Sequence, residues 1–490
     1  MERARWTSRT IFLFAAIGSA VGLGNVWRFP YLAGRYGGGA FLVPYLIMLV
    51  ILGVPLLILE FAIGQKMQLG ATGSFGRIKH KLSSIGFGAI LCGFGVCSYY
   101  AVVMAWCLLY LIFSFSLKWG VDTEGFFLNQ ILHLSPQSLD MGQVVTPILF
   151  SLVVVWMAVY FSIWKGIKSV SKVVTVTMPL PIILLVVLAI RGVTLPGSLE
   201  GIVHYLKPNF SALLDLEVWH AAASQIFFTL SIAFGIMIAY ASYKHERSDI
   251  AKSAIITSIV NSAISIVAGF VVFATLGYMA KQEGVQVSNY ISQISGPSLT
   301  FIVFPKILSL IPFASAFSVL FFVMLFTLAI DSAFSLVEAV CTVVSDKYPH
   351  LRRQDVSMYV CVTGFVAGMI FTTYAGLYYL DVADHYITHY GLLFVGLLEA
   401  IAIGWLYGVE ELRLYINSVS EIRIGRWWNV LIKYIIPVIL MVLLAYTFIK
   451  DINTPYGGYP QKILWIYGWG ILVVIGLISY LLAHFSAPKR

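Results

Sequence analysis

Residues 18–30 read GSAVGLGNVWRFP and lie inside a long apolar run that begins at Ile11. The three glycines, the asparagine and the arginine of this stretch weaken or polarise a helix where lipid offers no water to satisfy the freed backbone groups. An ordinary membrane helix would avoid this combination. The stretch therefore predicts a helix that is broken inside the membrane, and the remaining sequence has to explain the break.

Composition places the whole chain in the membrane. Of its 490 residues, 60% are hydrophobic and 11% are charged, whereas soluble proteins carry about 25% charged residues. The apolar blocks run for about twenty residues and lack the alternating pattern of a barrel. We predict an all-α integral membrane protein with twelve transmembrane helices, over residues 10–35, 39–65, 86–117, 146–164, 170–191, 219–243, 252–280, 314–345, 356–373, 379–407, 430–450 and 462–485.

The loops between these spans differ in charge. When the N-terminus is placed inside, the inner segments hold most of the 31 lysines and arginines. The positive-inside rule then predicts a multi-pass protein of the cell membrane with both termini cytoplasmic. The formal net charge of +9 fits anionic lipid headgroups, and no nucleic-acid partner is needed to explain it.

The span at 219–243 repeats the anomaly of the first span. It holds Gln225, Thr229 and Gly235 near its middle and comes five spans after the first break. Paired interruptions of this kind indicate an inverted repeat with a binding site between its halves. Small residues also serve simply to pack membrane helices closely, but two breaks with Asn25 and Gln225 beside them favour a site.

Intramembrane acids form a second group of candidates. Asp331 lies in the apolar middle of its span with no lysine or arginine in that span, and a carboxylate at this depth needs a compensating partner. A bound cation is the preferred partner, because Arg28 is placed near the outer end of the first span; a protonated structural aspartate is the alternative. For Glu60 and Glu399, structural and functional roles are equally compatible with the sequence.

Neutral donors form a third group. Gln225 and Thr229 are four residues apart, as are Asn261 and Ser265, so that each pair projects from one helical face. All four side chains can donate hydrogen bonds without carrying charge. Such a cluster suits a chloride ion, although polar contacts between helices explain the same spacing.

Several stretches resemble the neurotransmitter:sodium symporter family, and the short outer loops resemble those of a prokaryotic member. They are GSAVGLGNVWRFPYL, GGGAFLVPYLIMLVILGVPLLILEFAIGQ, SQIFFTLSIAFGIMIAYASY, NSAISIVAGFVVFATLGYMA and LAIDSAFSLVEAV. The resemblance implies a LeuT-type 5+5 inverted repeat with broken helices 1 and 6. The implied parts are an N-terminal cytoplasmic segment (1–9), a first repeat (10–191), an outer loop (192–218), a second repeat (219–407), and two last helices with a cytoplasmic tail (408–490).

The resemblance also implies two sodium sites built from oxygen ligands, which suit a hard cation. The first would use Ala20, Asn25, Thr229 and Asn261. The second would use Gly18, Val21, Leu328, Asp331 and Ser332.

A substrate site is implied between the two breaks. Its residues would be Ala20, Gly22, Leu23, Gly24, Val96, Tyr100, Phe228, Ser231, Ala233, Phe234, Ser332, Ala333 and Leu336. Gly22 stands where monoamine-transporting relatives carry an aspartate, which argues for a substrate with its own carboxylate. The apolar remainder of the site favours a neutral amino acid, because burying an unpaired charge is costly.

The family pattern further implies a chloride site and two gates. Chloride would be held by Tyr45, Gln225, Thr229, Asn261 and Ser265. The outer gate would comprise Arg28, Asp384 and Phe234, and the inner gate Arg3, Trp6, Tyr243 and Asp346.

The sequence thus predicts a sodium-coupled, chloride-assisted symporter of neutral, aliphatic amino acids that works by alternating access. Two rivals remain: a proton-coupled or exchange transporter on the same fold, and a sensor that binds an amino acid without transporting it. An enzyme is not expected, because the sequence offers no nucleophile with a base, metal-ligand cluster or phosphate loop.

Overall fold

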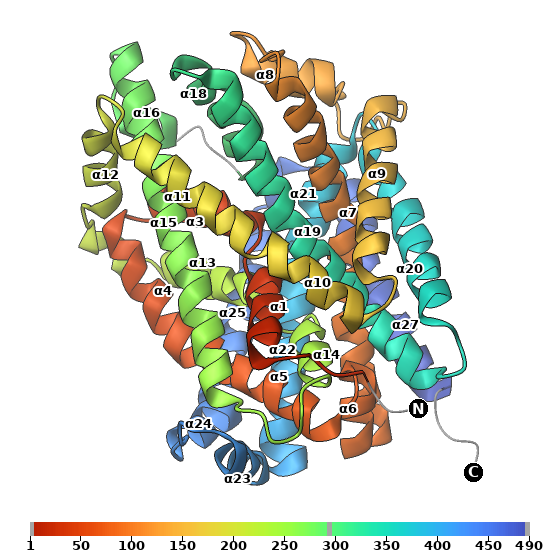
Figure 1. The fold of residues 1–490 in the computed structure, drawn as a ribbon. Coiled ribbons are helices and arrows are strands. Elements are labelled where there is room, and N and C mark those ends of the chain that lie inside the picture. The colour runs from red at the N-terminus through yellow and green to blue at the C-terminus, as the bar shows by residue number, and fades with distance from the viewer. Residues whose placement is uncertain (1–3, 292–295, 486–490) are drawn as a thin grey trace.

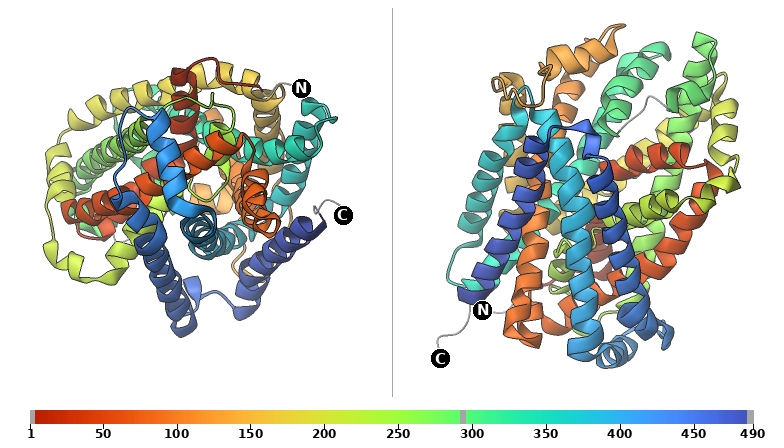
Figure 2. Two further views of the ribbon diagram at one scale, coloured as in Figure 1. Left: turned by 90° about the horizontal axis from the view of Figure 1, so that it is seen from below. Right: turned by 180° about the vertical axis from the view of Figure 1, so that it is seen from behind.

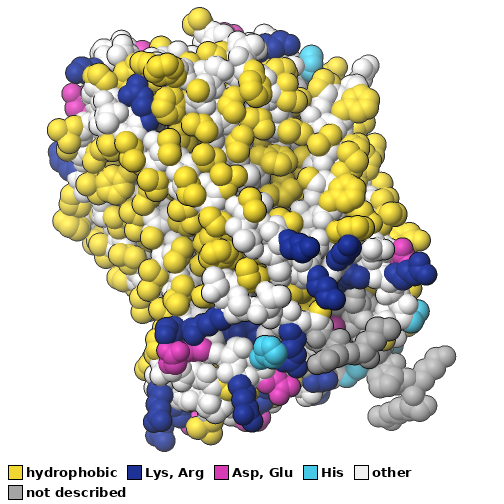
Figure 3. All heavy atoms as spheres, viewed as in Figure 1, with side chains coloured by type: hydrophobic (Ala, Val, Ile, Leu, Met, Phe, Trp, Pro, Cys, Tyr) yellow, Lys and Arg dark blue, Asp and Glu magenta, His cyan; other side chains and the backbone are white. Residues whose placement is uncertain are grey.

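The computed structural model describes residues 4–291 and 296–485. This part of the chain is helical and contains two isolated β-bridges but no strand, as Figure 1 shows. The predicted all-α class is therefore confirmed. Hydrophobic side chains cover a broad band of the face drawn in Figure 3, and charged side chains gather toward its lower end.

The described residues of the first half of the chain form fourteen α-helices. They are α1 (Arg9–Ala20), α2 (Leu23–Val26), α3 (Arg28–Arg35), α4 (Leu42–Met48), α5 (Val54–Met67), α6 (Ala71–Ile78), α7 (Ser83–Ser114), α8 (Thr123–Gly125), α9 (Thr146–Ile163), α10 (Ile167–Thr177), α11 (Pro179–Val193), α12 (Ser198–Leu206), α13 (Leu216–Thr229) and α14 (Ile236–Ala241).

The described residues of the second half continue with α15 (Ala251–Glu283), α16 (Val287–Ile291), α17 (Gly296–Ser298), α18 (Phe304–Leu310), α19 (Ala314–Lys347), α20 (Arg353–Gly368), α21 (Gly376–Tyr386), α22 (Leu393–Ile401), α23 (Val409–Val419), α24 (Trp427–Val430), α25 (Ile436–Asn453), α26 (Gln461–Ile463) and α27 (Gly470–Phe485). Short 3-10 segments occur at Gly39–Phe41, His80–Leu82, Phe210–Leu214, Met369–Thr372 and Tyr456–Gly458. Wider, π-helical segments occur at Leu49–Gly53, Phe126–Ile131, Leu299–Val303, Ile387–Leu392, Ala402–Gly408, Leu431–Ile435 and Leu464–Trp469.

Ten helical stretches of the described residues are long and apolar enough to cross a membrane, and each overlaps a predicted span. The first predicted span is a bent pair, Arg9–Ala20 and Leu23–Arg35, with an angle of 62° between its halves. The predicted span 219–243 is divided into α13 and α14, and α14 has only six residues. The structure therefore supports ten or eleven spans by length and composition, and the full count of twelve stays a prediction.

The first break is built by the residues that the sequence singled out. Helix α1 ends at Ala20, and Val21 and Gly22 adopt extended conformations before α2 begins. The Asn25 side chain accepts a hydrogen bond from the Gly22 backbone N–H at 2.9 Å, which caps the second half of the helix. An asparagine in an apolar span is thus explained by a backbone group that lipid could not satisfy.

The second break spans residues 230–235 and is conformationally strained. Ser231, Ala233 and Gly235 have φ values of +53°, +66° and +72°. Such values cost L-residues about 1 to 3 kcal/mol each unless neighbouring contacts hold them. Two contacts do so here: the Glu60 carboxylate accepts the Ala233 N–H at 2.7 Å, and the Ser231 hydroxyl donates to the Ser19 carbonyl at 3.1 Å.

The broken helices lie in the middle of the bundle. Helices α7 and α19 pack against each other, and α1 contacts α10, α14, α15 and α19. Figure 2 shows the helical bundle from below and from behind. The two breaks are therefore enclosed by protein on several sides.

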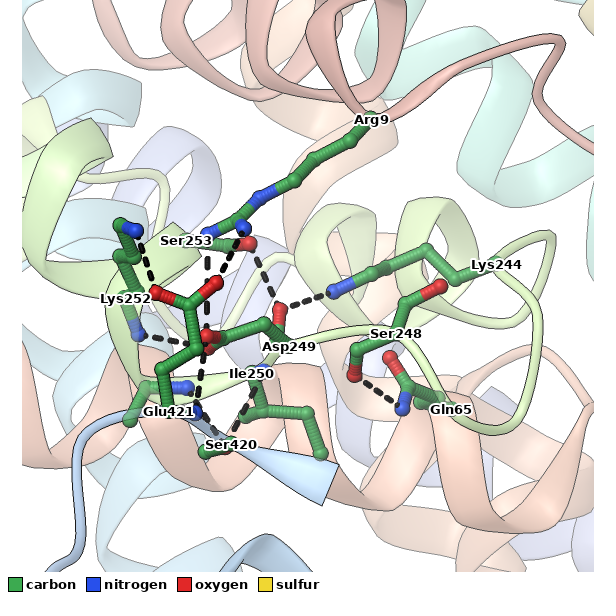
Figure 4. A network of polar contacts seen from close by, with 11 residues as sticks. Arg9, Gln65, Lys244, Ser248, Asp249, Ile250, Lys252, Ser253, Ser420 and Glu421 are labelled. Atoms are coloured by element: carbon green, nitrogen blue, oxygen red, sulfur yellow. Dashed lines mark hydrogen bonds and ion pairs between the residues drawn. The ribbon is translucent and has the colours of Figure 1, made fainter.

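A polar network ties α1 to two loops at the end of the molecule where α1 begins (Figure 4). Arg9 lies 3.8 Å from the Asp249 carboxylate and 3.6 Å from the Glu421 carboxylate. Asp249 also accepts the backbone N–H of Glu421, and Lys252 pairs with Glu421. Lys244 donates to the Asp249 carbonyl at 2.8 Å.

Lys244 is buried in this network, with only 3% of its surface exposed. Its ammonium group lies 4.5 Å from the Phe12 ring centroid and 5.7 Å from that of Phe61. Burial lowers the pKa of Lys244 to about 7, although the charge of Asp249 opposes this change.

We predict that the protein becomes more stable as the pH rises from about 7 to about 9. The unfolded lysine keeps its proton up to about pH 10.4, so the unfolded state binds more protons than the folded state in this window. The expected gain reaches about 2 kcal/mol and disappears in Lys244→Met. Thermal unfolding in detergent at both pH values measures it.

Lys252→Met is the matched control, because Lys252 belongs to the same network but has 41% of its side chain exposed. It should retain the rise of stability with pH. An equal rise in Lys244→Met would show that another group is responsible.

Candidate functional site

A small cavity with a volume of about 40 Å³ lies where the two broken helices meet, with α7 and α19 contributing its remaining walls. Among the residues that the structure describes, none of the side chains that line it is charged. The lining residues are Ser19, Ala20, Gly22, Leu23, Gly24, Asn25, Val96, Tyr100, Phe228, Thr229, Ser231, Phe234, Ile236, Ser332 and Leu336.

The cavity collects all but two of the residues predicted to bind substrate. Ala233 and Ala333 are buried but do not belong to the lining. Ser19 and Ile236 do belong to it and were not predicted for this role. The position of Ile236 directly after Gly235 could have indicated it, because the first residue of a resumed helix borders the break.

One end of the cavity combines a backbone amide with a phenol. The Leu23 N–H points at the Tyr100 hydroxyl at 3.3 Å. A Cβ atom built on Gly22 would lie 2.8 Å from the Ser332 hydroxyl and 3.2 Å from the Tyr100 hydroxyl. Position 22 therefore has room for a side chain only if Ser332 or Tyr100 moves.

The side chains of the predicted first sodium site are in contact with one another. The Asn25 amide donates to the Asn261 side-chain oxygen at 2.9 Å, and Asn261 lies 3.2 Å from the Thr229 hydroxyl. Ala20, whose carbonyl completes the predicted set, borders the same cavity. The side chains of this predicted set are therefore in contact, with Asn25 meeting Asn261 through its amide nitrogen.

The predicted second sodium site centres on Asp331, which is 2% exposed. Its Oδ1 atom has no hydrogen-bond partner among the described residues. A Cβ atom on Gly18 would lie 2.6 Å from Oδ2, so the backbone of α1 approaches this carboxylate closely. The neighbouring Ser332 hydroxyl donates to the Ser19 carbonyl at 3.3 Å.

The other two members of this predicted set are Val21 and Leu328. Both are buried, on α1's broken end and on α19, and these two segments pack together. A buried carboxylate is neutralised either by a cation or by a proton. An oxygen-only donor set of this kind is compatible with a small monovalent cation.

The predicted chloride residues surround the same asparagines. The Asn25 amide donates to the Ser265 hydroxyl at 2.8 Å, and the Gln225 amide lies 3.5 Å from the Gly24 carbonyl. The Tyr45 hydroxyl contacts Ser262 at 3.1 Å. Tyr45, Gln225, Asn261 and Ser265 are fully buried, and Thr229 is nearly so.

The acids Glu60 and Glu399 lie elsewhere and interact with each other. Both are fully buried, and the charge of Glu60 acts on Glu399. Glu60 uses one oxygen to hold the Ala233 amide, while neither oxygen of Glu399 has a hydrogen-bond partner within residues 4–291 and 296–485. Burying two interacting carboxylates is costly when both are ionised.

The predicted outer gate is arranged differently from a direct ion pair. Arg28 lies 3.5 Å from a ring nitrogen of His389 and 5.2 Å from the Phe228 ring centroid. Asp384 instead accepts a hydrogen bond from the Tyr99 hydroxyl at 2.6 Å. Phe234 meets Phe228 edge to face, with 6.2 Å between ring centroids, over the cavity that both line. His389 was not predicted to belong to this gate.

The predicted inner gate is partly visible. Trp6 is buried, and its indole N–H donates to the Tyr240 carbonyl at 2.8 Å while its backbone N–H donates to the Tyr243 carbonyl. Asp346 accepts the Gly70 N–H at 2.7 Å. Arg3 lies outside the described residues.

Comparison with known proteins identifies the family. The sequence matches the Sodium:neurotransmitter symporter family over residues 3–124 and 120–486. It is 41% identical to an uncharacterized sodium-dependent transporter of Methanocaldococcus jannaschii, over all of this chain and 99% of that one. It is 37% identical to a sodium-dependent dopamine transporter of Caenorhabditis elegans, over 93% of this chain and 82% of that one. This chain therefore belongs to the sodium:neurotransmitter symporter family.

Proposed function

We propose that the chain is a sodium-coupled symporter of neutral, aliphatic amino acids that works by alternating access. The observation that carries this proposal is the cavity between the two breaks, whose lining combines free backbone, hydroxyls and apolar side chains but, in the described chain, no charge. An amino-acid zwitterion needs polar groups for its backbone part only. A charged side chain in such a cavity would lack a partner.

The substrate carboxylate would meet the amides around Leu23 and the Tyr100 hydroxyl. These groups face each other at 3.3 Å, at the start of the bent half Leu23–Arg35. Helix starts attract anions through their free N–H groups. The substrate amino group would then meet carbonyls of the breaks and the Ser231 hydroxyl.

The dopamine-transporting relative raises the question of an amine substrate without a carboxylate. Gly22 argues against such a substrate here, because an aspartate at this position would pair with an amine in the family pattern. The close approach of Ser332 and Tyr100 to position 22 adds a steric argument in the same direction. Val96, Ile236 and Leu336 would form the apolar wall that receives an aliphatic side chain.

We further propose two sodium sites and a chloride site. The first sodium ion would lie among Ala20, Asn25, Thr229 and Asn261, and the second beside Asp331. Two sodium ions, a zwitterion and one ionised aspartate leave a net charge of +1 in a region of low dielectric. Chloride among Tyr45, Gln225, Thr229, Asn261 and Ser265 would compensate this charge.

The membrane arrangement that we propose has twelve spans, in two repeats of five related by inversion and two final helices. Helix 1 would be the bent pair of α1 and Leu23–Arg35. Helix 6 would be the divided pair of α13 and α14. Both termini would be cytoplasmic in the cell membrane. The residue ranges of the repeats are those given from the sequence.

The two rivals differ from this proposal either in the ion that drives transport or in whether transport follows binding. A proton-coupled or exchange transporter would use Asp331 as a proton carrier. A sensor would bind an amino acid and not release it across the membrane.

A screen of the twenty amino acids tests the proposal. We expect sodium-dependent binding, measured by scintillation proximity, with residues from alanine to leucine competing best and tryptophan worst. A misfit of one methylene already changes affinity by about 1 to 3 kcal/mol, and an aromatic ring should cost more. Uptake into proteoliposomes should require sodium and fail with choline; binding without uptake would favour the sensor.

The role of Asp331 generates a second prediction. Asp331→Asn should weaken the apparent sodium affinity by about tenfold or more, because it removes the only charge that the site offers in the family pattern. Asp355→Asn, at an exposed acid of α20, is the control and should behave as wild type. Unchanged sodium dependence in Asp331→Asn would exclude the ligand role, and a lost pH dependence would favour the proton-coupled rival.

Chloride dependence is the third prediction from this site. Replacing chloride by gluconate should lower uptake, and Ser265→Glu should restore it by placing a fixed negative charge in the cluster. Ser265→Ala removes the hydroxyl without adding charge and should not restore uptake. Wild-type uptake that is equal in gluconate and in chloride would refute the assignment.

A further inference from the structure

Three histidines stand in a row beside the outer gate. His389 lies between the other two, with ring centroids 4.9 Å from His385 and 5.7 Å from His220. They come from α13, α21 and the segment Ile387–Leu392. His389, Arg28 and Asp384 are each partly exposed.

The hydrogen bonds of His389 define its protonation state. Its Nδ1 atom lies 3.1 Å from the His385 carbonyl oxygen, which can only accept, so Nδ1 carries a proton. Its Nε2 atom lies 3.5 Å from a nitrogen of Arg28, which can only donate, so Nε2 presents a lone pair. His389 is therefore the neutral tautomer and serves as an acceptor for Arg28.

The contact with His389 positions the Arg28 guanidinium group. The guanidinium group lies over the Phe228 ring at the edge of the cavity, while Asp384 is bound by the Tyr99 hydroxyl. Tyr99 interacts electrostatically with both Arg28 and Asp384, and no ion pair joins these two residues in the described structure. A neutral acceptor contacts the cation, and the predicted anionic partner is bound by Tyr99 instead.

The other charged groups around the histidines already have partners. Asp451 is bound by His385 at 2.6 Å and by Tyr390 at 2.8 Å. The remaining pairs are Glu217 with Lys450 and Tyr36, and Asp381 with Tyr456 and Tyr459. His220 contacts the Thr447 hydroxyl. His389 thus faces Arg28 and two further histidines but, in the described structure, makes no hydrogen bond to a carboxylate.

We propose that His389 is a positioning residue of the outer gate, which holds Arg28 apart from Asp384 while it is neutral and releases Arg28 to Asp384 when it is protonated. A protonated imidazole has no lone pair for Arg28 and repels it. The released guanidinium then pairs with the Asp384 carboxylate and closes the path to the cavity. The consequence for transport rests on the proposed function.

Uptake as a function of external pH tests this positioning. We expect wild-type uptake to fall about fivefold once the external pH, lowered stepwise from about 7.5, is acidic enough to protonate His389, since one hydrogen bond is worth about 1 kcal/mol. His389→Gln keeps a neutral acceptor that does not titrate, so its uptake should change less than about twofold. His389→Lys carries a permanent charge and should transport poorly at every pH of this series.

Two controls separate His389 from its neighbours and from misfolding. His220→Gln removes a histidine of the same row without touching the Arg28 contact, and it should keep the fall in acid. If His389→Gln is unstable in detergent, His389→Asn provides a second neutral side chain. Wild-type acid sensitivity that persists in both neutral variants would overturn the proposal.

A second readout does not depend on transport. The thiol introduced by Val96→Cys, at a residue that lines the cavity, should react with a membrane-impermeant reagent only when the outer path is open. Comparing Val96→Cys alone with the double variant Val96→Cys, His389→Gln at the same pH cancels the intrinsic effect of pH on the thiol. In acid, labelling of Val96→Cys should be slower than labelling of the double variant, and near pH 7.5 the two rates should be equal. Equal rates at both pH values would overturn the proposal.

The two experiments fail in different ways. If sodium-dependent uptake is absent at every pH, the proposed function fails, while the labelling rates still decide the role of His389. If uptake is present and its pH profile ignores His389, the proposed function stands and the positioning role is wrong.

Discussion

An unwound backbone inside an apolar environment has to find its hydrogen-bond partners within the protein, and this constraint governs the centre of the molecule. The Glu60 carboxylate meets it at Ala233, and the Asn25 side chain meets it at Gly22. Residues of both breaks also line the cavity, together with the hydroxyls of Tyr100 and Ser332. The polar surface of the site thus combines residues of the broken helices with neutral side chains of α7 and α19.

One side chain that makes contacts on two sides also links the first break to the proposed ion sites. Asn25 caps a helix with its oxygen and donates with its nitrogen to Asn261 and Ser265. A single side chain therefore couples the geometry of the first break to the helix that carries the neighbouring donors. A displacement of either helix has to change the spacing of the whole cluster.

Much of this arrangement could be predicted from the sequence. Glycines and an asparagine in an apolar run locate the first break, and the spacing of Gln225 and Thr229 locates one face of the second. The sequence could not predict that Ala233 turns its amide to Glu60, since this depends on a left-handed conformation that alanine rarely adopts. His389 was missed for a similar reason: a histidine on a helix signals nothing until Arg28 is found beside it.

The left-handed residues Ser231 and Ala233 have a further consequence for how tightly a ligand can bind. Glycine would adopt these angles without strain, but it would also leave the segment free to sample many conformations. With the Ala233 amide held by the Glu60 carboxylate and the Ser231 hydroxyl held by the Ser19 carbonyl, this segment is ordered before anything enters the cavity. Ligand binding then loses less affinity to the ordering of the site, because the segment already lost its conformational freedom during folding.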